Sequence, residues 1–371
     1  MKIICSKASL LKSVNISLKA VPSKTTMPIL ECILIDATTN QIKFTTNDME
    51  LGIETLVEGV IEQKGIVAVD AKIFYEIIRR LPDNDVTIKT DDKLNVTITC
   101  EKAKFNIPGK SGEDFAYLPL IERDEVLTIS QYTLKEMIRQ TIFSIAINEN
   151  NKLMTGELFE LKNNFLKVVS LDGHRIAIRK MQLKKDYSDR KVVVPGKTLN
   201  EISKILSGEL DDTVNIYFTK NHILFEFDQT IVVSRLIEGE YFRIDQMLSS
   251  DYETSITINR KEFLGCIDRA TLLVREGDKK PIIIRITDDQ MELRIDSAMG
   301  SMNEEIDIEK TGRDIIIGFN PKFLIDALKV IEDETVDIYL VNPKAPCFIR
   351  DKEETYTYLI LPVNINQNQA R

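Results

Sequence analysis

An internal repeat limits the folds that are open to this 371-residue chain. A strand-like run, a short polar break and an amphipathic helical segment recur six times, and the helical segments begin near residues 7, 71, 132, 197, 260 and 321. Successive starts are 61 to 65 residues apart, so pairs of units recur about every 125 residues. Self-similarity at a fixed period indicates repeated structural units. The sequence therefore predicts three similar domains, each made of two similar halves.

Each helical segment is followed by alternating runs with polar turns between them, as in residues 85–100, 213–227 and 335–349. Such runs are typical of β-hairpins. Each half thus has the predicted order β-α-β-β-β, and the fold class is α+β, with helices on one side of sheets. We expect domains at residues 1–122, 123–250 and 251–371, with two helices in each.

Charge is distributed unevenly along the chain. The net charge of −9 argues by itself against a nucleic-acid partner, because Lys and Arg neutralise phosphates. The six predicted helices nevertheless carry +9 together, which leaves −18 on the rest of the chain. Lys and Arg are good helix formers on any solvated face, but Glu is equally good and is not used equally. The pattern favours a basic helical surface that holds a polyanion by its phosphates without reading bases.

The chain contains no Trp, and its helix faces lack aromatic residues. Single-stranded nucleic acid is usually held by stacking on such rings, so duplex DNA fits better. Little supports catalysis: His174 and His222 are far apart, and the sequence has no H-x-x-x-H, C-x-x-C or glycine-rich phosphate loop. The five scattered cysteines are expected to be reduced thiols. We expect no metal, no cofactor and no enzymatic activity.

The chain has no apolar run of the length of a membrane span, and its first residues do not read as a cleavable leader. These features predict a cytoplasmic protein with no membrane partner.

Residues 168–181, VVSLDGHRIAIRKM, gather side chains that would suit a hydrolase centred on His174. The stretch alternates around Asp172-Gly173, however, which is a strong hairpin turn signal. Ser170 and His174 then fall on opposite arms, adjacent strand residues point to opposite faces, and no oxyanion hole is evident. We expect a turn here and not an active site.

Eight segments spread over the whole chain resemble the bacterial DNA polymerase III β subunit family, the sliding clamps: TTMPILECILI, TTNDMELGIE, IPGKSGEDF, FSIAINENNKLMTGELFEL, SLDGHRIAIRKM, SRLIEGEYF, IGFNPKFLIDAL and YLILPVN. The resemblance implies a head-to-tail homodimeric ring, with sheets outside and two helices per domain lining a hole for duplex DNA, and no catalysis. The implied partners are duplex DNA without sequence preference, a second copy of the chain, the α subunit of the replicative polymerase, the δ subunit of the clamp loader, and other proteins with a clamp-binding motif.

The resemblance also assigns residues to three surfaces, with ordinary surface or core positions as the alternative for each. Positions facing DNA are Lys12, Lys24, Lys72, Arg80, Asn148 and Lys197. Positions at the ring closure, between the first domain of one subunit and the third of the other, are Phe105, Leu272 and Leu273. Positions in a partner-peptide groove between the second and third domains are Met154, Leu171, Gly173, His174, Arg175, Ile176, Phe242, Met247, Asn320, Phe323, Leu361, Pro362 and Val363.

Three departures from the family leave the peptide preference open. Many members have a proline after the aromatic residue of GEYF, where this chain has Phe242-Arg243, and a C-terminal arginine is replaced by Asn364. Residues 364–371 form a polar tail that we expect to be disordered. The alternative from another functional class is a repeat-built scaffold that binds peptides and does not bind DNA.

Overall fold

The structure is a computed structural model that describes residues 1–147, 150–248, 251–274 and 280–365. The chain forms two compact units. One comprises Met1–Lys135 and Lys197–Leu236, and the other comprises Glu136–Gly196 and Ile237–Arg371. All three crossings between the units fall inside the predicted second domain, whose residues are therefore divided between the two units.

The described part of the chain has six α-helices, each beginning within one residue of its predicted start: α1 (Lys7–Ser17), α2 (Ala71–Arg80), α3 (Gln131–Arg139), α4 (Gly196–Ile205), α5 (Arg260–Thr271) and α6 (Pro321–Val330). Four begin at a polar residue whose side chain accepts a hydrogen bond from a backbone N–H of the first turn; these are Ser6, Asp70, Asn259 and Asn320. Such N-caps satisfy N–H groups that have no partner inside the helix, which is why strand gives way to helix here.

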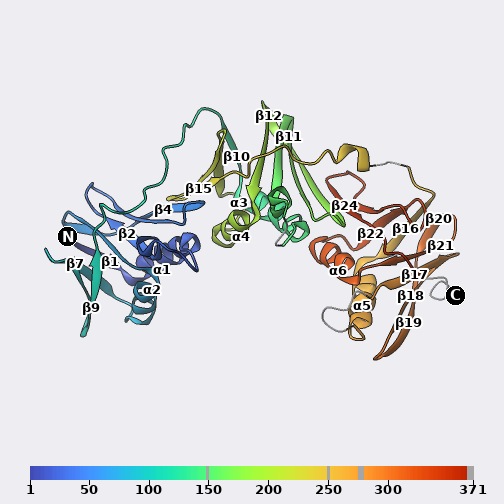
Figure 1. Ribbon diagram of the computed structural model, residues 1–371, viewed down its shortest axis with the longest axis horizontal. Coiled ribbons are helices and arrows are strands. Elements are labelled where there is room, and N and C mark those ends of the chain that lie inside the picture. The colour runs from blue at the N-terminus through green and yellow to red at the C-terminus, as the bar shows by residue number, and fades with distance from the viewer. Residues whose placement is uncertain (148–149, 249–250, 275–279, 366–371) are drawn as a thin grey trace. The chain divides into compact units, whose positions relative to one another are not determined.

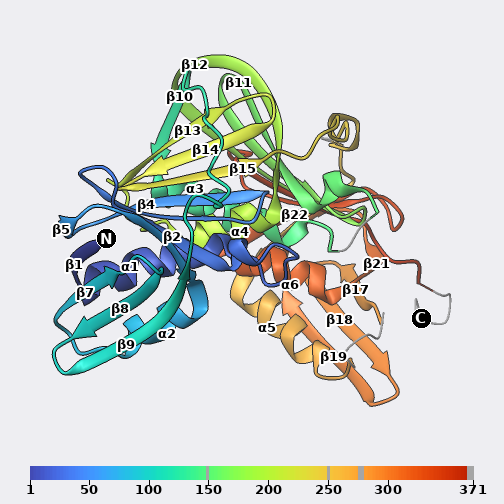
Figure 2. The ribbon, with the colours of Figure 1, turned by 60° about the vertical axis from the view of Figure 1, so that its left-hand side comes forward.

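The first unit contains one antiparallel sheet, drawn in Figures 1 and 2. Its strands are β1 (Lys2–Ser6), β2 (Cys32–Asp36), β3 (Ile42–Asn47), β4 (Leu51–Val57), β5 (Val60–Gln63), β6 (Ile66–Asp70), β7 (Asp85–Thr90), β8 (Asn95–Cys100), β9 (Ala103–Lys110), β10 (Val126–Ser130), β13 (Thr213–Phe218), β14 (His222–Phe227) and β15 (Thr230–Arg235). Their order is β10-β13-β14-β15-β4-β3-β2-β6-β9-β8-β7-β1-β5. Helix α1 packs against α2, β3 and β4. The pairing of β15 with β4 carries the sheet from the predicted first domain into the second.

The second unit contains two sheets. Its strands are β11 (Gly156–Leu171), β12 (Arg175–Pro195), β16 (Thr254–Asn259), β17 (Ile282–Thr287), β18 (Gln290–Ser297), β19 (Gly300–Asp307), β20 (Glu309–Gly312), β21 (Ile315–Phe319), β22 (Thr335–Leu340), β23 (Cys347–Arg350) and β24 (Tyr356–Ile360). The orders are β11-β12-β24-β23-β22-β16-β20 and β19-β18-β17-β21, and α5 packs against α6. Pairing of β12 with β24 joins the predicted second domain to the third.

The three predicted hairpins are confirmed as β7–β8, β13–β14 and β22–β23. The half-repeat is wrong in one place, because the strand expected just before α4 is the end of β12, a strand of 21 residues. Beyond the part of β12 that pairs with β24, β11 is its only partner among the described strands, and the side chains of β12 there are largely exposed. A polar run therefore continues the strand instead of breaking it. Short strands β5 and β20 are also additional to the predicted order.

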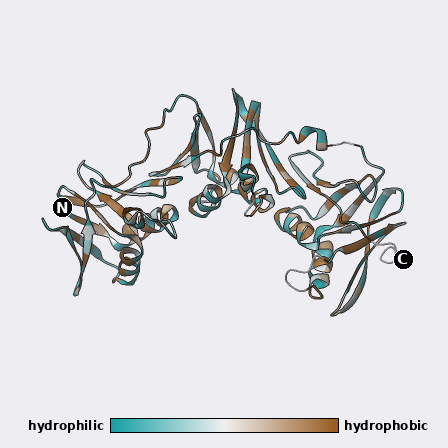
Figure 3. Cartoon of the chain, viewed as in Figure 1, coloured by the Kyte–Doolittle hydropathy of each residue, from teal (hydrophilic) through white to brown (hydrophobic). Residues whose placement is uncertain are grey.

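Each of these helices carries both hydrophobic and hydrophilic residues (Figure 3), and buried apolar residues of α1 and α2 join the core of the first unit, as those of α5 and α6 join the core of the second. All five cysteines are buried free thiols, as predicted. Burial raises the pKa of Cys5 and of Cys266 to about 12, which keeps these thiols protonated. Among the described residues, no helix has both the length and the apolar character needed to span a membrane.

Candidate functional site

The hairpin turn between β11 and β12 is built by two residues, as predicted. The Asp172 carboxylate accepts hydrogen bonds from the backbone N–H groups of His174 (3.0 Å) and Arg175 (3.1 Å). Gly173 has a φ of 84°, in the left-handed region that favours glycine. Asp172 is therefore a turn former.

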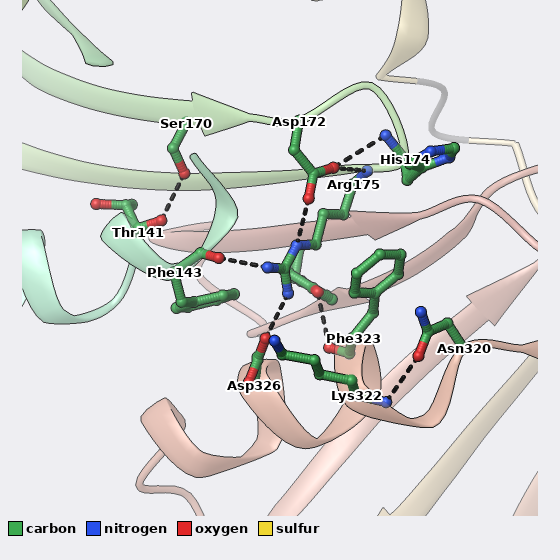
Figure 4. A network of polar contacts seen from close by, with 11 residues as sticks. Thr141, Phe143, Ser170, Asp172, His174, Arg175, Asn320, Lys322, Phe323 and Asp326 are labelled. Atoms are coloured by element: carbon green, nitrogen blue, oxygen red, sulfur yellow. Dashed lines mark hydrogen bonds and ion pairs between the residues drawn. The ribbon is translucent and has the colours of Figure 1, made fainter. Parts of the chain in front are cut away.

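The two residues after the turn face opposite sides, and Figure 4 shows the contacts of the second. His174 is exposed, whereas only 7% of the Arg175 side chain is exposed. Arg175 Nε donates to Asp172 Oδ2 at 2.9 Å, and Nη1 donates to Asp326 Oδ2 on α6 at 2.6 Å. Its Nη2 donates to the backbone carbonyl of Phe143. One guanidinium thus ties three segments of the second unit together.

Aromatic rings surround this guanidinium. The Arg175 guanidinium carbon lies 4.4 Å from the ring centroid of Phe323 and 5.5 Å from that of Phe143. The His174 ring stacks on Phe323 with centroids 6.3 Å apart. The Tyr358 hydroxyl donates to the backbone carbonyl of Phe323 at 2.7 Å. Phe323 is therefore held between the exposed and the buried side of the hairpin.

The electrostatics keep Arg175 charged in this buried place. Burial alone disfavours the charged form, but Tyr358, Asp326 and Asp172 together hold the pKa of Arg175 above its ordinary value. The same burial raises the pKa of Tyr358, so its hydroxyl stays a donor at neutral pH.

The reactive side chains of residues 168–181 do not converge. Ser170 is buried, and its hydroxyl donates to the backbone carbonyl of Thr141 at 2.5 Å. The hydroxyl is thus directed away from His174 (Figure 4). Neither His174 nor Asp172 contacts it in the described hydrogen bonds. The hairpin therefore lacks the arrangement of nucleophile and base that a hydrolase needs.

Other predicted groove residues lie around the hairpin. Leu171 and Ile176 belong to a hydrophobic cluster against which Met154 and Phe242 pack. The backbone N–H of Leu361 donates to the His174 carbonyl at 2.9 Å, which places the segment after β24 beside the turn. We call the thirteen predicted groove residues the hairpin surface.

Several members of the hairpin surface expose apolar area. Met247 is 53%, Leu361 38% and Val363 36% exposed, with Pro362 half-buried between the last two. Val363 is fixed by a backbone hydrogen bond to Gly318. Asn320 is the N-cap of α6, so its role in the fold was missed by the groove assignment. Exposed apolar side chains on a fixed framework suit the capture of a peptide.

The predicted DNA-facing residues fall into two groups. Lys12, Lys24 and Lys72 are exposed, and within the described residues no ion pair engages them. Arg80 forms an ion pair with Glu76 on the same helix. The three lysines therefore keep their charge available to a polyanion.

Lys197 is different, because it forms an ion pair with Asp48, whose side chain is only 5% exposed. Asp48 also accepts hydrogen bonds from the backbone N–H groups of Leu51 (2.7 Å) and Glu50 (3.0 Å) at the β3–β4 turn. Lys197 thus has a structural partner that the sequence did not reveal. The remaining predicted residue, Asn148, lies outside the described residues.

The predicted ring-closure residues are largely at the surface. Phe105 is 39% exposed and, in the first unit, borders a hollow of about 330 Å³ lined by Lys72, Ile73, Glu76, Ile77, Arg80 and Phe105. In the second unit, Leu272 is 75% exposed at the end of α5, and Leu273 packs partly against the core. Ile73, which is 50% exposed, was not predicted.

Three family models match the chain in tandem. The N-terminal domain of the DNA polymerase III beta subunit matches residues 1–119, the central domain 128–242 and the C-terminal domain 245–364. The prediction of three domains of one fold is confirmed by these matches.

Comparisons of the whole chain with known proteins agree with these domain matches. The beta sliding clamp of Staphylococcus aureus is 33% identical over 360 residues, covering 94% of this chain and 95% of its own length. A solved structure described as a DNA polymerase III beta subunit from Eubacterium rectale has 68% identity and a TM-score of 0.96, with 98% of this chain and 100% of that chain covered. A sliding clamp from Pseudomonas aeruginosa, solved bound to griselimycin, has 22% identity and a TM-score of 0.93, with the same coverage. The chain therefore belongs to the DNA polymerase III beta subunit family, and it is a non-catalytic DNA sliding clamp that supports processive synthesis.

Proposed function

We propose that two copies of this chain, each with domains at residues 1–122, 123–250 and 251–371, close head to tail into a ring around duplex DNA in the cytoplasm. The observation that carries the proposal is the charge bias of the helices, with exposed Lys12 and Lys72 on α1 and α2 free of ion pairs within the described residues. Phosphate contacts of this kind attract DNA without fixing its sequence, and they stay weak enough to permit sliding.

Charge reversal tests the DNA-facing surface. We expect Lys12→Glu combined with Lys72→Glu to reduce retention of the loaded protein on nicked circular DNA at least tenfold, measured by gel filtration of the complex. The matched control reverses two exposed lysines away from the helices, Lys64 and Lys93, and should retain DNA normally. Lys197 is left unchanged, because reversing it would place a carboxylate beside Asp48. Unimpaired retention by the helix variant would favour the scaffold that does not bind DNA.

For ring closure, we propose that Leu272 and Leu273 of one subunit contact the hollow beside Phe105 of the other. Both sides expose apolar side chains, which is the property an association surface needs. Head-to-tail contacts of this kind close into a ring when the rotation between subunits permits.

We further propose that the hairpin surface docks short peptides of the replicative polymerase α subunit, the clamp loader δ subunit and other clamp-binding proteins, and that it also binds griselimycin. Its support is the exposed apolar area of Met247, Leu361 and Val363 around the exposed His174. His174→Ala should weaken griselimycin binding about tenfold in calorimetry and leave DNA retention unchanged. Equal loss of both activities would mean that the substitution acts through folding.

A further inference from the structure

We propose that Arg175 is a positioning residue of the hairpin surface: it fixes the β11–β12 hairpin against α6 and so sets the shape of the surface to which partners dock, without contacting them. The proposal rests on the docking function proposed for this surface. Arg175 and Asp326 then support the residues that contact a partner, and do not contact the partner themselves.

The donor atoms of Arg175 are directed inward. Each of its three nitrogens donates to a different segment: Nε to Asp172 in the turn, Nη1 to Asp326 on α6, and Nη2 to the carbonyl of Phe143 in the 3-10 turn Ile142–Ser144. Only 7% of the side chain is exposed. A docked molecule therefore finds almost none of this guanidinium accessible.

The residues that a docked molecule can reach lie on both sides of this ion pair. His174 precedes Arg175 on the hairpin and is exposed, while Phe323 lies on α6 with Asp326 and Asn320 caps the start of that helix (Figure 4). The Arg175–Asp326 pair thus joins the hairpin part of the surface directly to the helical part. Binding sites keep their affinity when supporting residues hold the contacting groups within roughly 0.5 Å of the productive geometry.

The chemistry of arginine is specific to this task. A planar guanidinium can donate in several in-plane directions while its face lies on an aromatic ring, as Arg175 does over Phe323 at 4.4 Å. A lysine keeps the charge but has one compact ammonium group on a flexible stem. Arg175→Lys should therefore keep a positive charge at this position but hold the β11–β12 hairpin less firmly against α6. Asp326→Asn removes the charge on the other side of the pair with little change of shape.

The first experiment measures griselimycin affinity by calorimetry. We expect Arg175→Lys and Asp326→Asn each to weaken binding about tenfold while both proteins stay folded by circular dichroism. The matched control is Arg313→Lys, which alters an exposed arginine–carboxylate pair with Glu253 (3.1 Å) in the same unit and should change nothing. Wild-type affinity in both the Arg175 and Asp326 variants would overturn the proposal.

The second experiment separates positioning from direct contact. Nitroxide labels on cysteines introduced at Lys180 of β12 and Lys322 of α6 report the distance between hairpin and helix, and labelling is selective because the native thiols are buried. We expect electron paramagnetic resonance to show a broader distance distribution in Arg175→Lys than in the parent or in Arg313→Lys. Weakened binding with an unchanged distribution would show that Arg175 touches the ligand, which is contrary to the proposal.

The two proposals fail in different ways. If His174→Ala and Phe323→Ala bind griselimycin as the parent does, or if the parent does not bind it, the hairpin surface is not a docking surface and both proposals fall. If those two variants weaken binding and the Arg175 and Asp326 variants do not, only the positioning role is wrong.

Discussion

At the scale of single residues, Glu157 on β11 carries an energetic cost that depends on pH. The side chain is fully buried, and burial raises its pKa well above the ordinary value of 4.5, against a smaller opposing effect of Thr141. The folded protein therefore holds this proton more tightly than the unfolded chain does. The protein loses stability as the pH rises above the pKa that Glu157 has in the unfolded chain. The loss is up to roughly 1.4 kcal/mol per pH unit until the pKa of the folded state is reached.

The substitution Glu157→Gln keeps the shape of the side chain and removes its titration. We expect the variant to gain stability relative to the parent as the pH rises from 5 to 8, by more than about 1 kcal/mol, in urea denaturation at each pH. Glu113→Gln, at an exposed site, serves as the control and should give a difference that does not change with pH. A pH-independent difference for Glu157→Gln as well would contradict the assigned cause.

The sequence predicts residues well where the signal is local. Asp172-Gly173 is a turn because both residues act on neighbouring backbone, and exposed Lys12 follows from helical spacing. The partners of Arg175 and Lys197 could not be predicted, since Asp326 is 151 residues from Arg175 and Asp48 is 149 from Lys197. Nothing in a single sequence links such positions, although each partner is required by the cost of burying a charge alone.

Among the structural elements, the β11–β12 hairpin depends on its turn glycine. An added Cβ at Gly173 meets nothing within 4 Å, so Gly173→Ala should cost only the left-handed backbone penalty of about 1 kcal/mol in urea denaturation. The same substitution at Gly265, inside α5, should instead stabilise by about 0.5–1 kcal/mol, because alanine is the better helix former and the added Cβ meets only the movable end of the Arg269 side chain, at 3.3 Å. Effects of the same sign at both positions would refute the backbone argument.

Helix starts were predictable to within one residue because strand, cap and helix follow one another in the sequence. The length of β12 was not, since its polar middle resembles a loop. This middle part is a strand because β11 pairs with β12 from Gly156↔Pro195 to Leu171↔Ile176. Pairing with a neighbour decided the structure there, over the local preference of the residues.

For the whole molecule, the proposed ring makes oligomeric state the decisive observable. We expect the parent to sediment at twice its subunit mass of 42.4 kDa, and Phe105→Asp to sediment as a monomer, because it places a charge in an apolar contact. Leu120→Asp is the matched control, since Leu120 is fully exposed in the same unit and away from the hollow. A dimeric Phe105→Asp would exclude this residue from the closure.

The two strand pairings that carry sheets across predicted domain limits, β15 with β4 and β12 with β24, have a mechanical consequence. Each pairing joins its two strands by main-chain hydrogen bonds over five residue pairs. In a closed ring, separating either pair of strands would leave their backbone N–H and C=O groups without partners. The proposed junction between subunits, by contrast, is made of side chains. Opening of such a ring would therefore occur at the junction between copies, and both strand pairings would stay intact.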